Sequence, residues 1–289
     1  GLRLEESFSA GNQVTQNMKF TKARFGWFPT VHLKYEFNDH HDMQLSYSRR
    51  VRRPRLWNLN PFTNYSDPMN LSTGNPYLDP EYTNSLELGY DFAREGTNIN
   101  TSLFYRQTTG IMSRVTTLDS TGVSHTTWEN LNNGTSYGLE LVFGQKLFKW
   151  WKINASGSFF HQQFEGDQVN EQARSSNSWT GKVNSAFTPM KGFDIQLSFF
   201  YNSPVVSASG ASDRFFSGGG GAGKMAENYW ADLGMRKDFL KGALSLSLRV
   251  QDLFKTQKYN SWSWGDNYET TTQRYRESRV LFLGLTYKI

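Results

Sequence analysis

Three short patterns in this chain carry side chains that could do bond chemistry. His161 falls near Ser158 on a predicted strand, which is the residue pair of a simple hydrolase. His40 and His41 could bind a metal ion, and residues 218–225 spell Gly-x-x-x-x-Gly-Lys-Met, part of a phosphate loop. Each has a simpler reading. One histidine among alternating polar residues fits the lining of a polar channel, adjacent histidines in a turn point apart, and methionine replaces the magnesium-binding Ser or Thr. The sequence therefore predicts no catalytic residue, no metal site and no cofactor.

Cationic and aromatic side chains outside these patterns favour ligand binding instead. Arginines at 49, 50, 52, 53 and 55 run from a predicted strand into a Pro54 loop, and aromatic residues recur on the other predicted loops. Loop aromatics are typical of ligand-binding surfaces, and also of a membrane-interface belt. The arginines could bind an anion or acidic groups of another domain, or they could pair with carboxylates such as Glu81 and Glu87. The candidate ligand contacts are Arg52, Arg53, Arg55, Trp57, Tyr65, Trp128, Trp262, Trp264 and Tyr268.

Composition limits the elements that could position these residues. The chain has 289 residues, no cysteine, a net charge of +5 and 16% aromatic residues, and its mean hydropathy is −0.63. A membrane-spanning helix is excluded because no apolar run approaches 18 residues. Lys and Arg are spread along the chain, and no Lys/Arg-rich run of the kind found in nucleic-acid arms occurs apart from Arg-Arg-Val-Arg-Arg at 49–53. We therefore expect no nucleic-acid partner.

Alternating apolar and polar residues predict about twelve antiparallel strands. In the segment after Pro80, for example, Leu86, Leu88 and Tyr90 alternate with Glu87 and Gly89. The predicted strands cover residues 2–5, 31–37, 43–48, 82–93, 99–107, 137–147, 152–164, 179–188, 194–201, 228–237, 244–253 and 279–289.

The connections between these strands alternate between short and long. Residues 38–42, 94–96, 148–150, 189–192 and 240–242 are short turns, whereas residues 6–24, 54–81, 108–135, 165–178, 204–223 and 255–275 are expected to be loops. Nothing in a soluble β-sandwich requires short and long connections to alternate, whereas an outer-membrane barrel has short periplasmic turns and long extracellular loops. Aromatic residues gather near the predicted strand ends, where interfacial girdles belong: Trp27, Phe28, Phe37, Phe92, Phe148, Trp150, Trp151, Phe193, Phe239 and Tyr287. The fold class is therefore predicted as an all-β antiparallel transmembrane barrel.

One motif adds a family resemblance. Gly-Asn-Pro-x-Leu-x-Pro-Glu, followed by a strand that contains Glu-x-Gly, resembles the barrel motif of TonB-dependent outer-membrane receptors. Residues 47–54 and 57–62 are similar to the Bacteroidetes branch, and the last strand resembles the C-terminal insertion strand, although it ends in Ile289 where the family usually has an aromatic residue. The residues that carry the motif are Gly74, Asn75, Pro76, Leu78, Pro80, Glu81, Glu87 and Gly89.

The resemblance implies that residues 1–289 are a single C-terminal region of a larger barrel. Plugged transporters of this kind have about 22 strands, so a plug domain and further strands are expected outside the chain. The implied function is energised uptake of a scarce nutrient (a metal chelate, vitamin, glycan or peptide) across the outer membrane of a Gram-negative cell. The implied partners are outer-membrane lipid and lipopolysaccharide, the TonB complex through the plug, and a surface lipoprotein as a further candidate. Two alternatives stay open: a stand-alone small barrel that acts as a passive pore or structural protein, and an outer-membrane hydrolase.

Overall fold

The computed structural model describes residues 1–14, 17–165, 175–207, 223–264 and 268–288. Its main sheet follows the order β1 (Leu2–Gln13), β2 (Met18–Asn38), β3 (His41–Arg52), β5 (Glu81–Arg94), β6 (Thr97–Leu118), β7 (Ser124–Phe148), β8 (Trp151–Glu165), β9 (Ser175–Met190), β10 (Phe193–Asn202), β13 (Asn228–Phe239), β14 (Leu244–Val250) and β17 (Leu281–Tyr287). The smaller elements are α1 (Leu56–Leu59), β4 (Asn70–Ser72), β11 (Val205–Ser207), β12 (Gly223–Met225), η2 (Leu240–Gly242), β15 (Tyr259–Trp264) and β16 (Glu269–Arg274).

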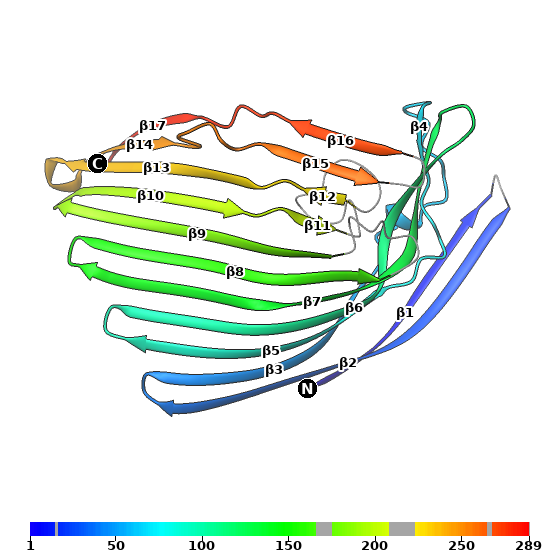
Figure 1. Ribbon diagram of the computed structural model, residues 1–289, viewed down its shortest axis with the longest axis horizontal. Coiled ribbons are helices and arrows are strands. Elements are labelled where there is room, and N and C mark those ends of the chain that lie inside the picture. The colour runs from blue at the N-terminus through cyan, green and yellow to red at the C-terminus, as the bar shows by residue number, and fades with distance from the viewer. Residues whose placement is uncertain (15–16, 166–174, 208–222, 265–267, 289) are drawn as a thin grey trace.

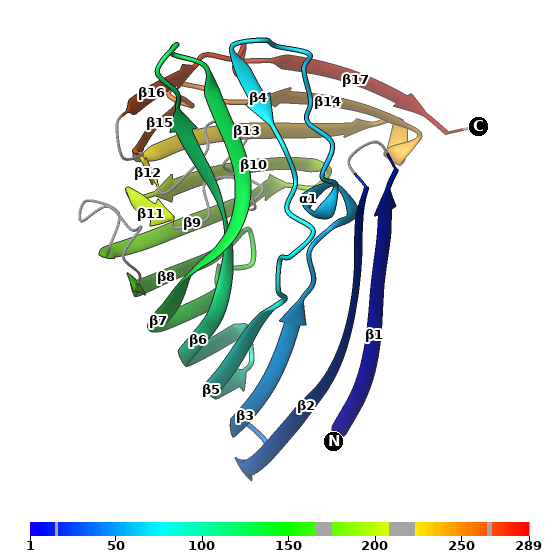
Figure 2. The ribbon, with the colours of Figure 1, turned by 90° about the vertical axis from the view of Figure 1, so that its right-hand side faces the viewer.

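The twelve strands of this order correspond one to one to the twelve predicted strands, and every neighbouring pair is antiparallel. The five short turns all lie at one end of the sheet, which confirms the predicted asymmetry (Figure 1). The strands curve into a trough with β1 and β17 at its two edges, and α1 lies on the concave side (Figure 2). Among the described residues, no helix is long and apolar enough to cross a membrane.

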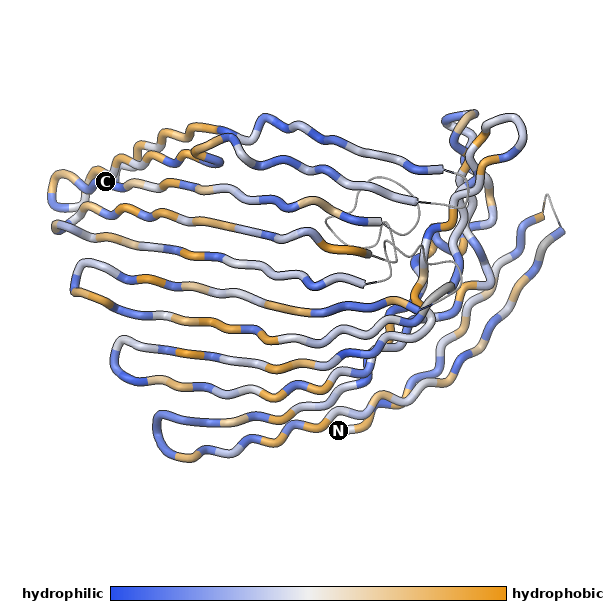
Figure 3. The backbone as a smooth tube through the Cα atoms, viewed as in Figure 1, coloured by the Kyte–Doolittle hydropathy of each residue, from blue (hydrophilic) through white to orange (hydrophobic). Residues whose placement is uncertain are grey.

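The two faces of the trough differ in polarity because directly paired residues share a face. One register line joins large apolar side chains that are each 38–60% exposed: Leu33, Leu45, Leu88, Leu103, Leu139, Phe159 and Trp179. The neighbouring line on the opposite face is mostly polar: Gln44, Gly89, Ser102, Glu140, Ser158 and Thr180. Along the strands of the main sheet in Figure 3, apolar positions are interspersed with polar ones. The polar line borders a hollow lined by Gln44, Gly89, Ser102 and Glu140, so the polar face is the concave one and the apolar face is the convex one. A lipid-embedded barrel wall requires this arrangement.

The structure corrects several predicted loops. Residues 6–24 belong largely to the β1–β2 hairpin, and residues 108–135 largely to the far half of the β6–β7 hairpin. Short strands β11, β12, β15 and β16 form a separate four-stranded sheet within segments predicted as loops. These strands lack a consistently apolar face, so period-two alternation could not reveal them. Part of the phosphate-loop pattern, residues 218–222, lies outside the described residues, and the rest is strand β12.

The prediction that Phe28 belongs to the interfacial aromatic girdle is wrong. Phe28 is only 3% exposed, lies within 6.4 Å of the Tyr82 ring and has the Arg3 guanidinium 5.0 Å from its ring centre. β2 pairs with β3 only from Thr30 onward. We infer that Phe28 fills the space that opens where the two strands diverge, instead of facing lipid.

Candidate ligand-binding site

The Gly74–Asn75 part of the motif binds the loop to helix α1. The Gly74 N–H donates to the Asn60 carbonyl at 2.8 Å and the Asn75 N–H donates to the Asn58 carbonyl at 2.6 Å. A β-carbon on Gly74 would lie 2.5 Å from the Asn60 carbonyl oxygen and 2.7 Å from that of Asn58. Glycine is required here by close backbone approach.

A Gly74→Ala substitution is therefore expected to destabilise the loop, at a cost of about 1–3 kcal/mol for overpacking. Limited proteolysis of the folded protein should reveal faster cleavage between residues 60 and 73. Gly89→Ala is the matched control, because a β-carbon there meets nothing closer than 3.8 Å. Equal protease resistance of the two variants would contradict this explanation of the glycine.

The second half of the motif holds the β6–β7 hairpin. The Asn75 side-chain amide donates to the Trp128 carbonyl at 2.9 Å. Asn130 accepts the Asp79 N–H at 2.7 Å and donates its amide to the Asp79 and Gly110 carbonyls, both at 2.8 Å. The loop after Gly74 and the bend of the hairpin at Gly110 are thus fixed to each other.

Glu81 closes this network from strand β5. Its carboxylate is 7% exposed, accepts the Met112 N–H at 2.6 Å and forms an ion pair with Arg52. This pair was one of the predicted alternatives for the arginines, and it is present. Glu87 instead pairs with Arg106 at 3.0 Å.

Two cations attach the β1–β2 hairpin to the same loop. Lys22 and Arg24 donate to the Tyr77 and Leu78 carbonyls, and both lie against the Asp79 carboxylate. Burial, the largest single influence, raises the pKa of Asp79, but hydrogen bonds and charge from Arg24 and Lys22 outweigh it and hold that pKa below its usual value. The ion pairs of Asp79 are therefore fully formed at pH values above the ordinary pKa of an aspartate. They are lost only as the pH falls through the lowered pKa of Asp79.

These contacts shape a pocket of about 610 Å³ at the long-loop end, which we call the arginine–tryptophan pocket. Five of the nine predicted contacts line it together: Arg52, Arg53, Arg55, Trp57 and Trp128. The rest of its wall comes from Asn58, Asn60, Phe62, Asn64, Ser72, Thr73, Gly74, Met112, Arg114 and Thr126.

Two of the four arginines in the pocket keep their charge uncompensated. Arg52 pairs with Glu81 and Arg53 with Glu5. Among the described residues, Arg55 and Arg114 have no ion-pair partner. Their guanidinium carbons lie 5.1 Å and 5.9 Å from the ring centres of Trp57 and Trp128 respectively. The pocket therefore offers two cations, each beside an indole ring.

Arg114 is the main residue that the sequence reasoning missed, because its segment was predicted as a loop. It lies directly opposite Trp128 in the β6–β7 ladder, and its Nε is buried without a hydrogen-bond partner. Burial lowers the pKa of Arg114, and an electrostatic interaction with Tyr268, which does not line the pocket, opposes that shift. The Asp119–Gly122 turn between two Thr- and Val-containing runs was the available signal for this hairpin.

The other predicted contacts lie elsewhere. Tyr65 is 70% exposed and does not line the pocket. Trp262 and Trp264 belong to β15, in the four-stranded sheet. The motif prolines, Pro76 and Pro80, are buried, as is Leu78 at 1% exposure, and these three residues anchor the loop.

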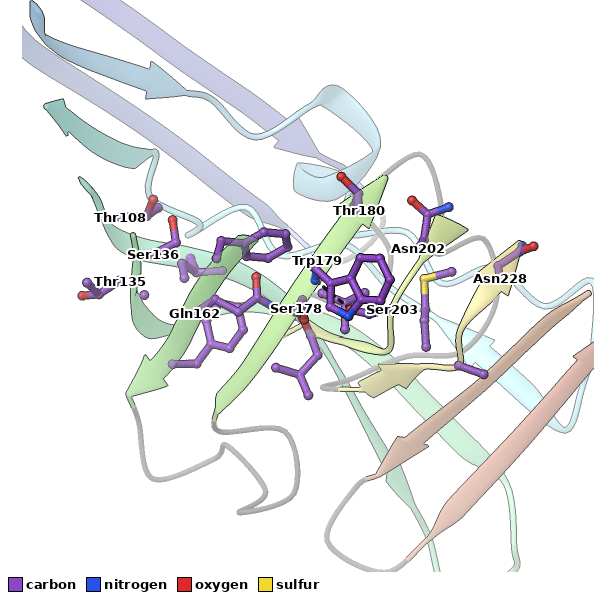
Figure 4. A pocket seen from close by; sticks show the side chains of 18 of the residues that line it. Thr108, Thr135, Ser136, Gln162, Ser178, Trp179, Thr180, Asn202, Ser203 and Asn228 are labelled. Atoms are coloured by element: carbon purple, nitrogen blue, oxygen red, sulfur yellow. Dashed lines mark hydrogen bonds between the residues drawn. The ribbon is translucent and has the colours of Figure 1, made fainter. Parts of the chain in front are cut away.

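A second pocket of about 470 Å³ shares Arg52 and Glu81 with the wall of the first and its surroundings, and its lining reaches from β6 to β13. Figure 4 shows its uncharged polar lining from β6 to β13, which includes Thr108, Gln162, Thr180, Asn202 and Asn228. Among the described residues, the charged members of its lining are Arg52 and Glu81, which pair with each other. These hydroxyl and amide groups alternate with apolar side chains, which include Ile111, Phe160, Phe164, Val206, Met225 and Trp230, so the pocket combines polar and apolar walls.

The histidines considered for bond chemistry make other contacts. His161 faces the convex side, where its ring lies 5.2 Å from that of Tyr137, whereas Ser158 is on the concave face and hydrogen-bonds Thr180. The expectation that His161 lines the lumen is therefore wrong, and the two residues cannot act together. His41 hydrogen-bonds the Tyr90 hydroxyl at 2.6 Å. No cluster of three potential metal ligands occurs within the described part of the chain.

Comparison with known proteins agrees with this geometry. Residues 1–287 match the model of the outer membrane protein beta-barrel family. The siderophore receptor PirA from Pseudomonas aeruginosa is 16% identical, with a TM-score of 0.62, and the match covers 99% of this chain and 45% of that one. The FrpB iron transporter from Neisseria meningitidis (F3-3 variant) is 15% identical, with a TM-score of 0.62 and coverage of 99% and 42%.

The copper transporter OprC has a TM-score of 0.71 at 15% identity, and the match covers 99% of this chain and 46% of that one. At these identities the likeness concerns the fold. The chain spans less than half the length of these solved structures.

Proposed function

We propose, on the premise that this chain belongs to the outer membrane protein beta-barrel family, that it forms the C-terminal wall of a transport barrel for an anionic nutrient. The chain is an outer-membrane protein, and its apolar convex face and polar concave face agree with that location. The observation that carries the transport proposal is the arginine–tryptophan pocket, which combines two uncompensated cations with two indole rings at the long-loop end.

An anionic chelate is the substrate class that suits this pocket. Guanidinium groups recognise carboxylate and phenolate oxygens, and indole rings stack on flat apolar surfaces. The solved structures of similar fold include receptors and transporters for a siderophore, iron and copper, which supports a metal chelate among the possible nutrients. The motif at Gly74–Gly89 resembles TonB-dependent receptors, so we propose energised uptake, with a plug domain supplied by a part of the protein outside this chain.

Uptake by whole cells tests the proposal against the passive alternative. Cells that produce the full-length protein should accumulate radiolabelled ferric catecholate or ferric carboxylate chelates, and an uncoupler of the proton-motive force should abolish accumulation. A passive pore would equilibrate the chelate with or without the uncoupler. An immunoblot of outer membranes separates the two further, because a transporter with a plug should run far above 33.2 kDa, and a small barrel near it.

The two free cations should dominate affinity for such a chelate. Arg55→Gln and Arg114→Gln are each expected to weaken binding about 10- to 100-fold, the range for one lost hydrogen bond to a charged group. Fluorescence titration of the purified full-length protein with the chelate measures the change. Arg94→Gln is the control, since Arg94 lies at the short-turn end, away from the pocket. Equal affinity of all three variants would exclude this pocket as the binding site.

A further inference from the structure

The convex face carries a row of residues that marks the edge of the apolar band toward the long loops. Register pairs join, from β3 to β9, Tyr47, Leu86, Tyr105, Tyr137, His161 and Asn177. Tyrosines and a histidine combine an apolar body with a polar tip, which places them at the boundary between lipid tails and headgroups.

The next row on the same face is entirely polar. It runs through Arg49, Asn84, Gln107, Thr135, Gln163 and Ser175. Arg49 is the ninth residue of β3, counted from His41 beside the short turn, and a strand crosses the hydrocarbon in about 9–11 residues. The two rows thus place the outer headgroup layer at Arg49, the single basic residue of the polar row.

Arg49 sits in an aromatic cage on this lipid-facing surface. Its guanidinium carbon lies 5.1 Å from the Trp27 ring centre and 5.2 Å from that of Tyr82. Within the described residues the guanidinium has no hydrogen-bond or ion-pair partner, and its Nε is buried. Trp27, which forms one wall of the cage, is 52% exposed.

The Arg49 guanidinium is therefore available to bind an anion from outside the described part of the protein. Cation–π contacts hold the guanidinium in position, but they provide no hydrogen-bond acceptor for its N–H groups. A phosphate group is bound well by the planar fork of an arginine. At the headgroup level of the membrane, phosphate is available from the lipids themselves.

We propose that Arg49, caged by Trp27 and Tyr82, binds the phosphate of an outer-leaflet lipid and thereby fixes a lipid molecule on the outer wall of β3. The site is separate from the arginine–tryptophan pocket, because Arg49 faces lipid and the pocket residues face the lumen. The inference depends on the membrane position of the sheet and not on the proposed transport activity.

Native mass spectrometry of the detergent-purified full-length protein tests this site directly. Phosphorylated lipid A should bind about 10- to 100-fold more tightly than its dephosphorylated form, as expected for one charged hydrogen-bonding contact. Millimolar inorganic phosphate should not displace the lipid, because free phosphate lacks the acyl chains that hold the headgroup beside Arg49. Displacement by inorganic phosphate would overturn the lipid as the occupant, and equal binding of the two lipids would overturn the site.

Substitutions then locate the contact. Arg49→Gln should remove the preference for the phosphorylated lipid, and Arg49→Lys should retain part of it. The matched control is Arg50→Gln, because the next residue on the same strand points to the opposite face, opposite Thr83. If Arg49→Gln and Arg50→Gln leave the preference equally intact, the aromatic cage serves only to accommodate Arg49. The comparison of the two lipids on the unmodified protein stands even if the Arg49→Gln barrel fails to assemble.

Discussion

A Leu141→Arg substitution is expected to destabilise the membrane-inserted barrel by about 2–4 kcal/mol, the range for arginine on the lipid face near the bilayer midplane. Leu141 is 44% exposed on the convex face, and lies between the Tyr137 row and the short turn that follows Phe148. An arginine there cannot reach either interface as readily as one near a strand end. Urea unfolding of the full-length protein from lipid vesicles measures the loss.

Glu140→Arg is the matched control for this prediction. Glu140 is the preceding residue of β7, but it faces the polar concave side opposite Ser102 and Ser158. We expect a change within about 0.5 kcal/mol there, as for an exposed substitution. If both variants lose the same stability, the apolar convex face does not contact lipid, and the assignment of faces would have to be reversed or abandoned.

The contrast between these two adjacent residues also explains how much of the fold could be predicted. Strands that cross the membrane must alternate, because one face meets lipid and the other meets water. Leu139 and Leu141 against Glu140 are such a pattern, and all twelve crossing strands were found from it. Beyond the membrane both faces meet water, so the alternation disappears.

The far half of the β6–β7 hairpin illustrates that limit. Ser113, Arg114, Thr116 and Thr117 read as loop residues, yet they pair in register with residues 125–129. The hairpin is stabilised by contacts that no periodicity encodes, such as the bond from the Asn75 amide to the Trp128 carbonyl. The pocket could therefore be predicted only in part: the arginines and tryptophans were recognisable by type, but the element that brings Arg114 to them was not.

The structure also separates structural arginines from available ones, which sequence could not do. Arg52 and Arg53 each pair with a carboxylate distant in sequence, Glu81 and Glu5. The partner of Arg52 is nearly buried, so this pair fixes the pocket wall. Arg55 and Arg114 have indole neighbours instead, which leave their N–H groups free for a ligand. The arginines of the pocket thus form two pairs: Arg52 and Arg53 stabilise its wall, and Arg55 and Arg114 are available to bind a ligand.

Glu81→Ala is accordingly expected to lower the free energy of unfolding by about 3 kcal/mol and to disrupt the arginine–tryptophan pocket. The substitution leaves the Met112 N–H buried without its 2.6 Å acceptor and removes the partner of Arg52. Because Arg52 is 43% exposed and water can solvate it once its partner is removed, the expected cost is at the lower end of the range for breaking a buried ion pair. The hairpin that carries Arg114 should then move away from helix α1, and its tip should become sensitive to protease near residues 119–123.

Two further variants separate the contributions of charge and hydrogen bonding. Glu81→Gln keeps an acceptor for the Met112 N–H and should recover about half of the loss, whereas Glu87→Ala removes a partly exposed pair with Arg106 and should cost at most about 1 kcal/mol. Urea unfolding gives the stabilities, and chelate titration reports the pocket. Since Glu81 contacts the hairpin and does not line the arginine–tryptophan pocket, weaker chelate binding by Glu81→Ala would show that the motif acts by positioning the hairpin. Full affinity in a variant with a protease-sensitive hairpin would mean that Arg114 is not needed, and the binding contacts would then be confined to Arg55 and Trp57.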